Sequence, residues 1–158
     1  MRALLMTILL LVAASTHART YSGEVTHVTD GDTLWVRSAR GKPRQVRLRG
    51  VDAPELCQPF GREARQALAS RVLHQRVAVS LSGKDDYQRW LGTVRSDGED
   101  VGAWLVAQGY AWAHRWRRQA SGPYAALEAK AREDRRGLWS ERGALDPRDF
   151  RKLHGKCH

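Results

Sequence analysis

The segment EVTHVTDGDTLWVRSARGKPRQVRLR, residues 24–49, decides the fold. It holds three extended runs, at residues 24–28, 34–36 and 45–49, separated by turns at 30–32 and 41–43. In the third run, the two-residue period of a strand places Val46 and Leu48 on one face, with Arg47 and Arg49 on the other. The segment therefore predicts a three-stranded meander.

The chain beyond this meander alternates between helical and extended patterns. Apolar residues recur at helical spacing from Pro59 to Leu73, and extended runs follow at residues 77–81 and 91–94. Two further helices are expected, at residues 101–108 and from Pro123 to Gly137. Five short strands, with a helix between the third and fourth and about three helices in all, predict an α+β fold. The architecture expected is a five-stranded oligonucleotide-binding (OB) Greek-key barrel.

Charge is the unusual feature of the composition. The 158 residues contain 27 Lys and Arg against 17 Asp and Glu, for a net charge of +10, and 42% are hydrophobic. This composition suits one globular domain and excludes a collagen-like, coiled-coil or polytopic membrane protein. A balance this basic favours polyanionic partners such as nucleic acid. The alternative is a secreted protein that is basic without any function attached to its charge.

The N-terminus has the pattern of a signal peptide at residues 1–18. Arg2 precedes an apolar run from Ala3 to Ala14, and small residues lead to a cleavage position after Ala18. The run is shorter than the roughly 20 residues that span a bilayer, although an uncleaved anchor is the alternative. We expect export to the periplasm or beyond, with no membrane attachment after signal cleavage.

Export bears on the two cysteines, Cys57 and Cys157. An even number of cysteines in an oxidising compartment favours a disulfide, which here would close a 100-residue loop. Chain entropy sets its stabilisation at about 4–5 kcal/mol at best. The alternative, a metal-binding tail of His154, Cys157 and His158, has too few ligands for a closed zinc site.

Residues suited to phosphodiester chemistry lie in three segments, each of which alone is an ordinary turn or surface loop. They are Asp30 and Asp32, then Arg47 with Asp52 and Glu55, and Arg89 in the loop that begins at Asp85. Carboxylate oxygens select calcium or magnesium over zinc. Arginines grip a phosphodiester and its transition state, and a glutamate can accept a proton from attacking water. Together they predict metal-assisted phosphodiester hydrolysis.

Five motifs in order resemble the staphylococcal nuclease family, over Tyr21 to Trp139. They are DGDT at 30–33, RLRGVDAPE at 47–55, YQR at 87–89, GYAWAHR at 109–115 and ARxxRRGLW at 131–139. The resemblance implies one staphylococcal nuclease-like domain at residues 19–158. It also implies a calcium-dependent endonuclease that hydrolyses DNA and RNA with little sequence specificity, leaving a 3′-phosphate and a 5′-hydroxyl.

The same resemblance assigns roles to individual residues. Asp32, Asp52 and the main-chain carbonyl of Ala53 correspond to the calcium ligands, and Asp30 lies just outside them. Glu55 corresponds to the proposed general base, and Arg47 and Arg89 to the phosphate-binding arginines.

Base contacts are where the sequence departs from the family's pattern. Arg115 and Arg117 replace a pair of nucleotide-stacking tyrosines, and Ala53 replaces a threonine. Candidate substrate contacts are Tyr87, Trp112, Arg115 and Trp116, with a place in the core as the alternative for either tryptophan.

Two other functions remain open at this stage. One is a nucleic-acid-binding module that keeps the barrel without catalysis, and the other is a secreted protein that binds anionic surfaces. The second leaves the carboxylates unexplained. No oligomer interface is evident in the sequence, so we expect a monomer.

Overall fold

The computed structural model describes residues 19–140, 143–155 and 157. The expected signal peptide, residues 1–18, lies outside these described residues. Within the described part of the chain, no helix has the length and apolar character needed to cross a membrane.

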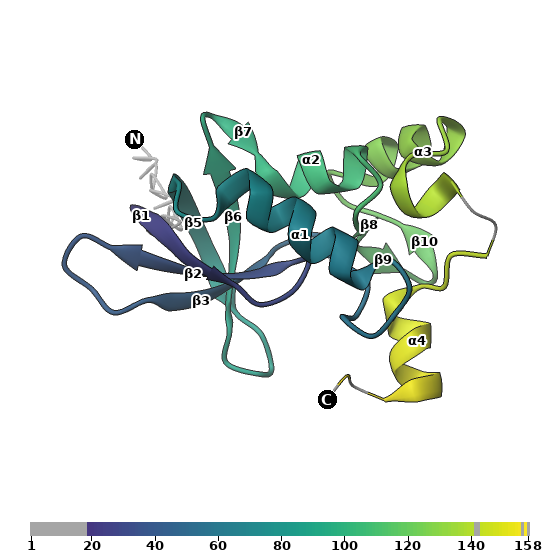
Figure 1. Cartoon of the computed structure of the whole chain (residues 1–158), viewed down its shortest axis with the longest axis horizontal. Helices are drawn as coiled ribbons and strands as arrows, with labels where there is room; N and C mark the ends of the chain where they lie inside the picture. Colours follow the sequence, from purple (N-terminus) through teal and green to yellow (C-terminus); the bar gives the residue numbers. More distant parts are fainter. Residues whose placement is uncertain (1–18, 141–142, 156, 158) are drawn as a thin grey trace, which may run out of the picture.

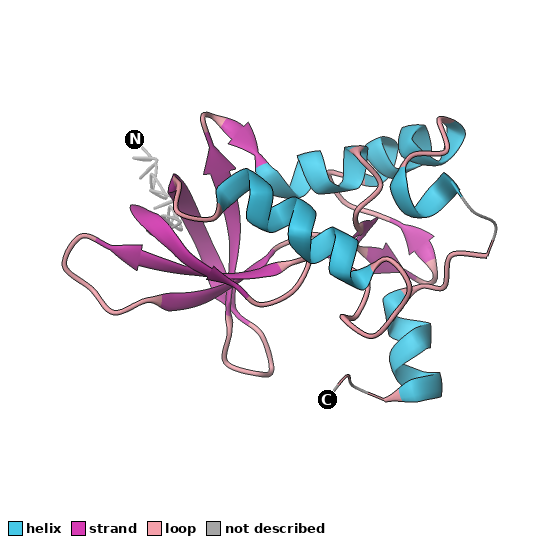
Figure 2. Cartoon of the chain, in the orientation of Figure 1, coloured by secondary structure: helices cyan, strands magenta, loops and turns pink. Residues whose placement is uncertain are grey.

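Five strands form a closed barrel, as the sequence predicted (Figures 1 and 2). They are β1 (Arg19–Val28), β2 (Thr33–Ser38), β3 (Arg44–Leu48), β5 (Arg76–Lys84) and β6 (Trp90–Ser96). Antiparallel pairing runs in the order β3-β2-β1-β5-β6. The barrel closes where β3 and β6 pair in parallel, with Val46 opposite Trp90 and Leu48 opposite Gly92.

The barrel core consists of the apolar face of each strand. Val25, Val36, Val46, Val79 and Val94, one from each strand, are fully buried. Because β-branched side chains fit a pleated, enclosed surface, valine at these positions stabilises both the strand conformation and the packing of the core. The alternation in the sequence therefore fixes which face of each strand points inward.

In the part of the chain that the structure describes, four α-helices lie outside the barrel. Figure 2 shows them in cyan. They are α1 (Gly61–Val72), α2 (Val101–Ala107), α3 (Ala125–Glu133) and α4 (Pro147–His154), with a 3₁₀ turn at Gly137–Ser140. The helix α1 buries Ala64, Leu68 and Val72 at the spacing read from the sequence. The Asp100 side chain caps α2 by accepting a hydrogen bond from the Ala103 N–H.

The helix α4 was not among the helices predicted from the sequence. Its start has an ordinary signal, since the Asp146 side chain accepts a hydrogen bond from the Arg148 N–H and Pro147 occupies the first turn. The helix has only eight residues and buries only Pro147 and Phe150, so few apolar positions mark it in the sequence. A disulfide between Cys57 and Cys157 joins the chain beyond α4 to the loop before α1.

Short strands outside the barrel position the neighbouring loops. The strand β4 (Val51–Asp52) pairs with β8 (Trp112–Ala113), and β9 (Arg115–Trp116) forms a hairpin with β10 (Gln119–Ala120). The strand β7 (Glu99–Asp100) extends β6 as an antiparallel partner. Because Asp52 lies opposite Trp112, β4 holds the loop after β3 against the helical part of the molecule.

Replacing Leu68 by alanine should lower the free energy of unfolding by about 2–5 kcal/mol, because the side chain is fully buried between α1 and the barrel. Leu153→Ala, at a side chain that is 70% exposed on α4, should change it by less than about 0.5 kcal/mol. Chemical unfolding followed by tryptophan fluorescence measures both. Equal losses in the two variants would contradict this packing.

Candidate active site

The turn between β1 and β2 holds a buried carboxylate in one orientation. Asp32 is only 3% exposed. Its Oδ1 accepts a hydrogen bond from Thr33 Oγ1 at 2.9 Å, and its Oδ2 accepts one from the Ala53 N–H at 3.0 Å. The Asp30 carboxylate in turn accepts from the Asp32 N–H at 3.0 Å. These contacts join the turn to the loop after β3.

Gly31 allows that close approach. A Cβ atom at this position would lie 2.7 Å from Ala53 Cβ and 2.8 Å from Ala64 Cβ. A larger residue would separate the turn from the loop at residue 53 and from α1. The glycine between the two aspartates is therefore required by packing.

Arg47 lies between two carboxylates, one from the turn after β1 and one from the end of β4. On β3, its guanidinium hydrogen-bonds Asp32 Oδ1, and its Nη2 donates to Asp52 Oδ1 at 3.0 Å. The period-two pattern correctly placed this arginine on the polar face of the strand. Asp32 and Asp52, which lie 15 and 5 positions from Arg47 in the sequence, thus contact the same guanidinium.

The carboxylates crowd one another, as their pKa values show. Burial, together with the negative charge of Asp32, raises the pKa of Asp30 to about 7. Burial and Asp32 also raise the pKa of Asp52, against the opposing effect of Arg47 and Arg151. Burial disfavours the charge on Arg47, yet the adjacent Asp32 and Asp52 raise its pKa overall, so it remains cationic. Excess negative charge at this point of the surface favours an additional cation.

The loop that carries Glu55 is held by Gln58. The buried Gln58 side chain accepts a hydrogen bond from the Glu55 N–H at 3.1 Å and donates to the Leu145 carbonyl at 2.6 Å. A Cβ at Gly61 would lie 1.8 Å from the Glu55 carbonyl oxygen, so α1 begins directly against this loop. The Glu55 carboxylate Oε1 accepts a hydrogen bond from Arg151 Nη1 at 2.7 Å.

Arg89 reaches the same site from the loop between β5 and β6. Its Nε and Nη2 both lie 2.7 Å from Asp85 Oδ2. The main-chain N–H of Arg89 donates to Asp85 Oδ1 at 3.0 Å. Burial acts to raise the pKa of Asp85, but these hydrogen bonds from Arg89 hold it below its ordinary value. The ring of Tyr87 lies 5.2 Å from the Arg89 guanidinium and is 65% exposed.

One open pocket unites the residues predicted for catalysis. Its lining includes Asp30, Asp32, Arg47, Ala53, Glu55, Tyr87, Arg89 and Arg151. Asp52 contributes through its contacts with Arg47 and Arg151. Three loops that are far apart in the sequence therefore present carboxylates and guanidinium groups to one space.

The sequence is similar to those of several known proteins. The family model described as "Staphylococcal nuclease homologue" matches residues 45–141. The chain belongs to the staphylococcal nuclease family. It is 41% identical to Protein ParB of Escherichia coli over 152 residues, which covers 90% of this chain and 85% of that protein. It is 35% identical to a Micrococcal nuclease of Shigella flexneri, with 96% and 92% covered. An uncharacterized endonuclease of Haemophilus influenzae is 33% identical, with 81% and 71% covered.

The acidic site of this family member fits a hard cation, although it is not a complete cage. Among the described residues, no group of three or more His, Cys, Asp or Glu side chains is arranged to hold a metal ion alone. Asp32 and Asp52 would nevertheless offer carboxylate oxygens to such an ion, close to the Asp30 carboxylate. Calcium accepts main-chain carbonyls and water as its remaining ligands. The residues therefore fit calcium with those additional ligands.

The residues predicted for base contacts lie in different environments. Trp112 is only 2% exposed and packs edge-on against Trp139, with ring centroids 5.2 Å apart, so the structure places it in a core cluster. Arg115 pairs with Glu128 and Asp146, each at 2.7 Å. Trp116, on the β9–β10 hairpin, is 68% exposed. Trp116 and Tyr87 therefore remain accessible to a base.

Arg151 is the site residue that sequence reasoning missed. It lies on α4, beyond the last family motif, and nearly 100 residues separate it from Asp52 and Glu55. The only sequence signals were the Asp-Pro helix start and Cys157 shortly after it. Neither pattern indicates that the guanidinium reaches the carboxylates.

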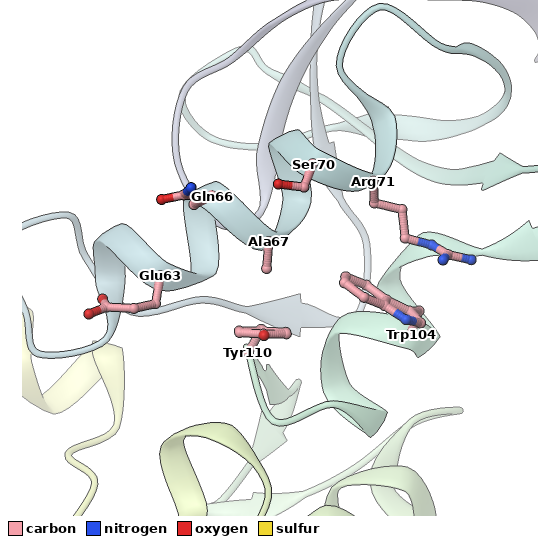
Figure 3. A pocket seen from close by; sticks show the side chains of 7 residues that line it. All are labelled: Glu63, Gln66, Ala67, Ser70, Arg71, Trp104 and Tyr110. Atoms are coloured by element: carbon pink, nitrogen blue, oxygen red, sulfur yellow. The ribbon is translucent and has the colours of Figure 1, made fainter.

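A second hollow lies between α1 and α2, away from these groups (Figure 3). Arg71 from α1 lies over the Trp104 ring of α2, 4.8 Å from its centroid, and Glu63 and Tyr110 line the same hollow. It contains none of the residues predicted for catalysis. We interpret it as the surface of a helix contact stabilised by a cation–π interaction.

Replacing Arg115 by alanine should lower the free energy of unfolding by about 2–3 kcal/mol, because Glu128 is buried and loses one of two guanidinium partners. Arg117→Ala, at a neighbouring exposed arginine, should change it by less than about 0.5 kcal/mol. Thermal or chemical unfolding measures both. If Arg115→Ala weakens nucleic-acid binding without lowering stability, Arg115 contacts substrate instead.

Proposed function

We propose that the protein is a calcium-dependent endonuclease that hydrolyses DNA and RNA with little sequence preference. One observation carries this proposal. Asp32, from the turn after β1, and Asp52, at the end of β4, both pair with Arg47. Asp32 and Arg47 line one pocket with Glu55 and Arg89. Membership of the staphylococcal nuclease family and resemblance to a Micrococcal nuclease support it.

Asp32, Asp52 and the Ala53 carbonyl would hold the calcium ion. Bound there, calcium supplies charge withdrawal from a phosphate oxygen and a site for water. The Ala53 N–H and Thr33 hydroxyl fix the orientation of the Asp32 carboxylate through their hydrogen bonds. Asp30 constrains the main chain of the same turn by accepting from the Asp32 N–H. The acidic turn is thus oriented before substrate arrives.

Glu55 acts as the general base, and the two arginines bind the reacting phosphate. Glu55 accepts a proton from the water that attacks phosphorus. Arg47 and Arg89 are fixed by ion pairs, with Asp32 and Asp52 in one case and Asp85 in the other. Because charge on the phosphoryl oxygens grows in the transition state, prealigned guanidinium groups stabilise that state more than the substrate. The products would carry a 3′-phosphate and a 5′-hydroxyl.

Binding of the nucleic-acid strand depends mainly on charge. The net charge of +10 supplies attraction to phosphates that does not depend on base identity. Trp116 and Tyr87, both largely exposed, offer aromatic faces on which any base can stack. We therefore expect affinity that falls steeply with added salt and varies little among sequences.

Export and a monomeric state complete the proposal. The N-terminal pattern of residues 1–18 supports export to the periplasm or beyond, and the Cys57–Cys157 disulfide suits an oxidising compartment.

Glu55→Gln and Arg89→Ala should each reduce kcat by a factor of about a hundred or more, since each removes a group aligned for the transition state. Cleavage of denatured DNA, with circular dichroism to verify folding, measures the effect. Arg40→Ala, at an exposed position in the β2–β3 turn, is the charge-matched control and should retain activity. Near-parent turnover in both site variants would refute the assignment.

Calcium should raise the unfolding temperature of the purified protein, and chelation should abolish cleavage until calcium is restored. Binding to the native state alone stabilises it by about 2.7 kcal/mol at a calcium concentration 100 times Kd. Asp52→Asn should remove the calcium-induced shift, whereas Asp97→Asn, in the exposed β6–β7 turn, should keep it. Cleavage at full rate in excess chelator would contradict the proposal, and DNA binding without cleavage would indicate a binding module.

A further inference from the structure

Arg151 connects the C-terminal helix to the carboxylates of the site. Its Nη1 donates to Glu55 Oε1 at 2.7 Å, and its Nη2 donates to Asp52 Oδ2 at 3.3 Å. The side chain is one-third exposed and lines the same pocket as Arg47 and Arg89. A single guanidinium therefore bridges Asp52, at the end of β4, and Glu55, in the loop between β4 and α1.

Three contacts hold α4 in the position that this requires. Beyond the C-terminal end of α4, Cys157 forms a disulfide with Cys57. Cys57 lies two residues after Glu55, so the disulfide attaches the end of α4 to the loop that carries Glu55. Before its N-terminal end, Gln58 hydrogen-bonds the Leu145 carbonyl, and Arg115 pairs with Asp146. Figure 1 shows α4, in yellow, beside the loop that precedes α1. Both ends of the helix are thus attached to the body of the site.

We propose that Arg151 is a positioning residue for Glu55, and that the Cys57–Cys157 disulfide maintains it in place. This inference rests on the proposed nuclease function, in which Glu55 accepts a proton from water. The activity of the enzyme then depends on whether Cys57 and Cys157 are oxidised to a disulfide, although neither cysteine takes part in the reaction.

The geometry favours positioning because Arg151 engages one oxygen of Glu55. Among the described residues, Arg151 alone hydrogen-bonds the Glu55 carboxylate, and it does so through Oε1. The other oxygen, Oε2, remains for the attacking water. A glutamate on a surface loop samples several rotamers, and a charge-assisted hydrogen bond reduces that freedom. Small displacements of a catalytic group are costly to the rate, so the constraint affects kcat.

The first test compares Arg151→Ala with Arg151→Lys and with Lys152→Ala, a charge-matched control on the same helix. With a short oligonucleotide and saturating calcium, Arg151→Ala should lower kcat about tenfold to a hundredfold and change KM little. Arg151→Lys should recover part of the loss, because an ammonium can make one of the two contacts. Lys152→Ala should retain the parent kcat. Measurements well below each variant's unfolding temperature separate positioning from loss of structure.

The second test removes the tether. The Cys57→Ser/Cys157→Ser double variant should lose kcat to a similar degree, while hydrogen exchange rises in α4 and stays unchanged in the barrel strands. Adding Arg151→Ala to this double variant should cause little further loss, because both changes release the same contact. Losses that multiply would show that the disulfide and Arg151 act independently, and would overturn the inference.

The remaining outcomes are decisive. Unchanged kcat in Arg151→Ala would overturn the positioning role, and increased kcat would show that Arg151 obstructs the site. Either result, with an active parent enzyme, leaves the nuclease proposal intact. A parent protein that cuts no nucleic acid under any metal condition would instead overturn the proposed function, and this inference with it.

Discussion

The ion pairs between Arg47 and the two carboxylates, Asp32 and Asp52, are the constraint on which the site depends. Burying two like charges close together is unfavourable unless a cation lies between them. Arg47 can fill that position because of its place on β3. This strand pairs with β2, which starts next to Asp32. It is also followed closely by β4, which ends at Asp52. Strand pairing therefore brings the acids together, and Gly31 and the Ala53 N–H allow their two segments to approach closely. The negative charge of the same carboxylates also favours binding of a divalent cation.

The barrel strands and the first three helices were predictable because their signals are local. Alternating valines and turn residues fix the strands, and apolar residues at helical spacing fix α1. The site residues of the central motifs followed from chemistry and resemblance together, and the structure places them around one pocket. Their roles as ligands, base and phosphate-binding groups remain proposals.

The missed features depend on contacts that are distant in the sequence. Arg151 joins Asp52 and Glu55 only because α4 folds back, and nothing in its neighbouring residues indicates a partner 96 to 99 positions away. Trp112 had a motif position that suggested base contacts, yet it is buried against Trp139. Arg115 is held by an ion pair with Glu128, and its contact with substrate stays a prediction. The residue type of a tryptophan or an arginine does not indicate whether its side chain is buried or exposed. The contacts that later parts of the chain make with these residues are therefore what local sequence patterns did not indicate.

The most direct test of the central claim is a crystal structure of the oxidised protein with calcium and a non-hydrolysable dinucleotide. The account predicts one calcium ion bound by oxygens of both Asp32 and Asp52, next to the phosphate that Arg47 contacts. Calcium bound elsewhere, or a phosphate held away from these residues, would contradict it.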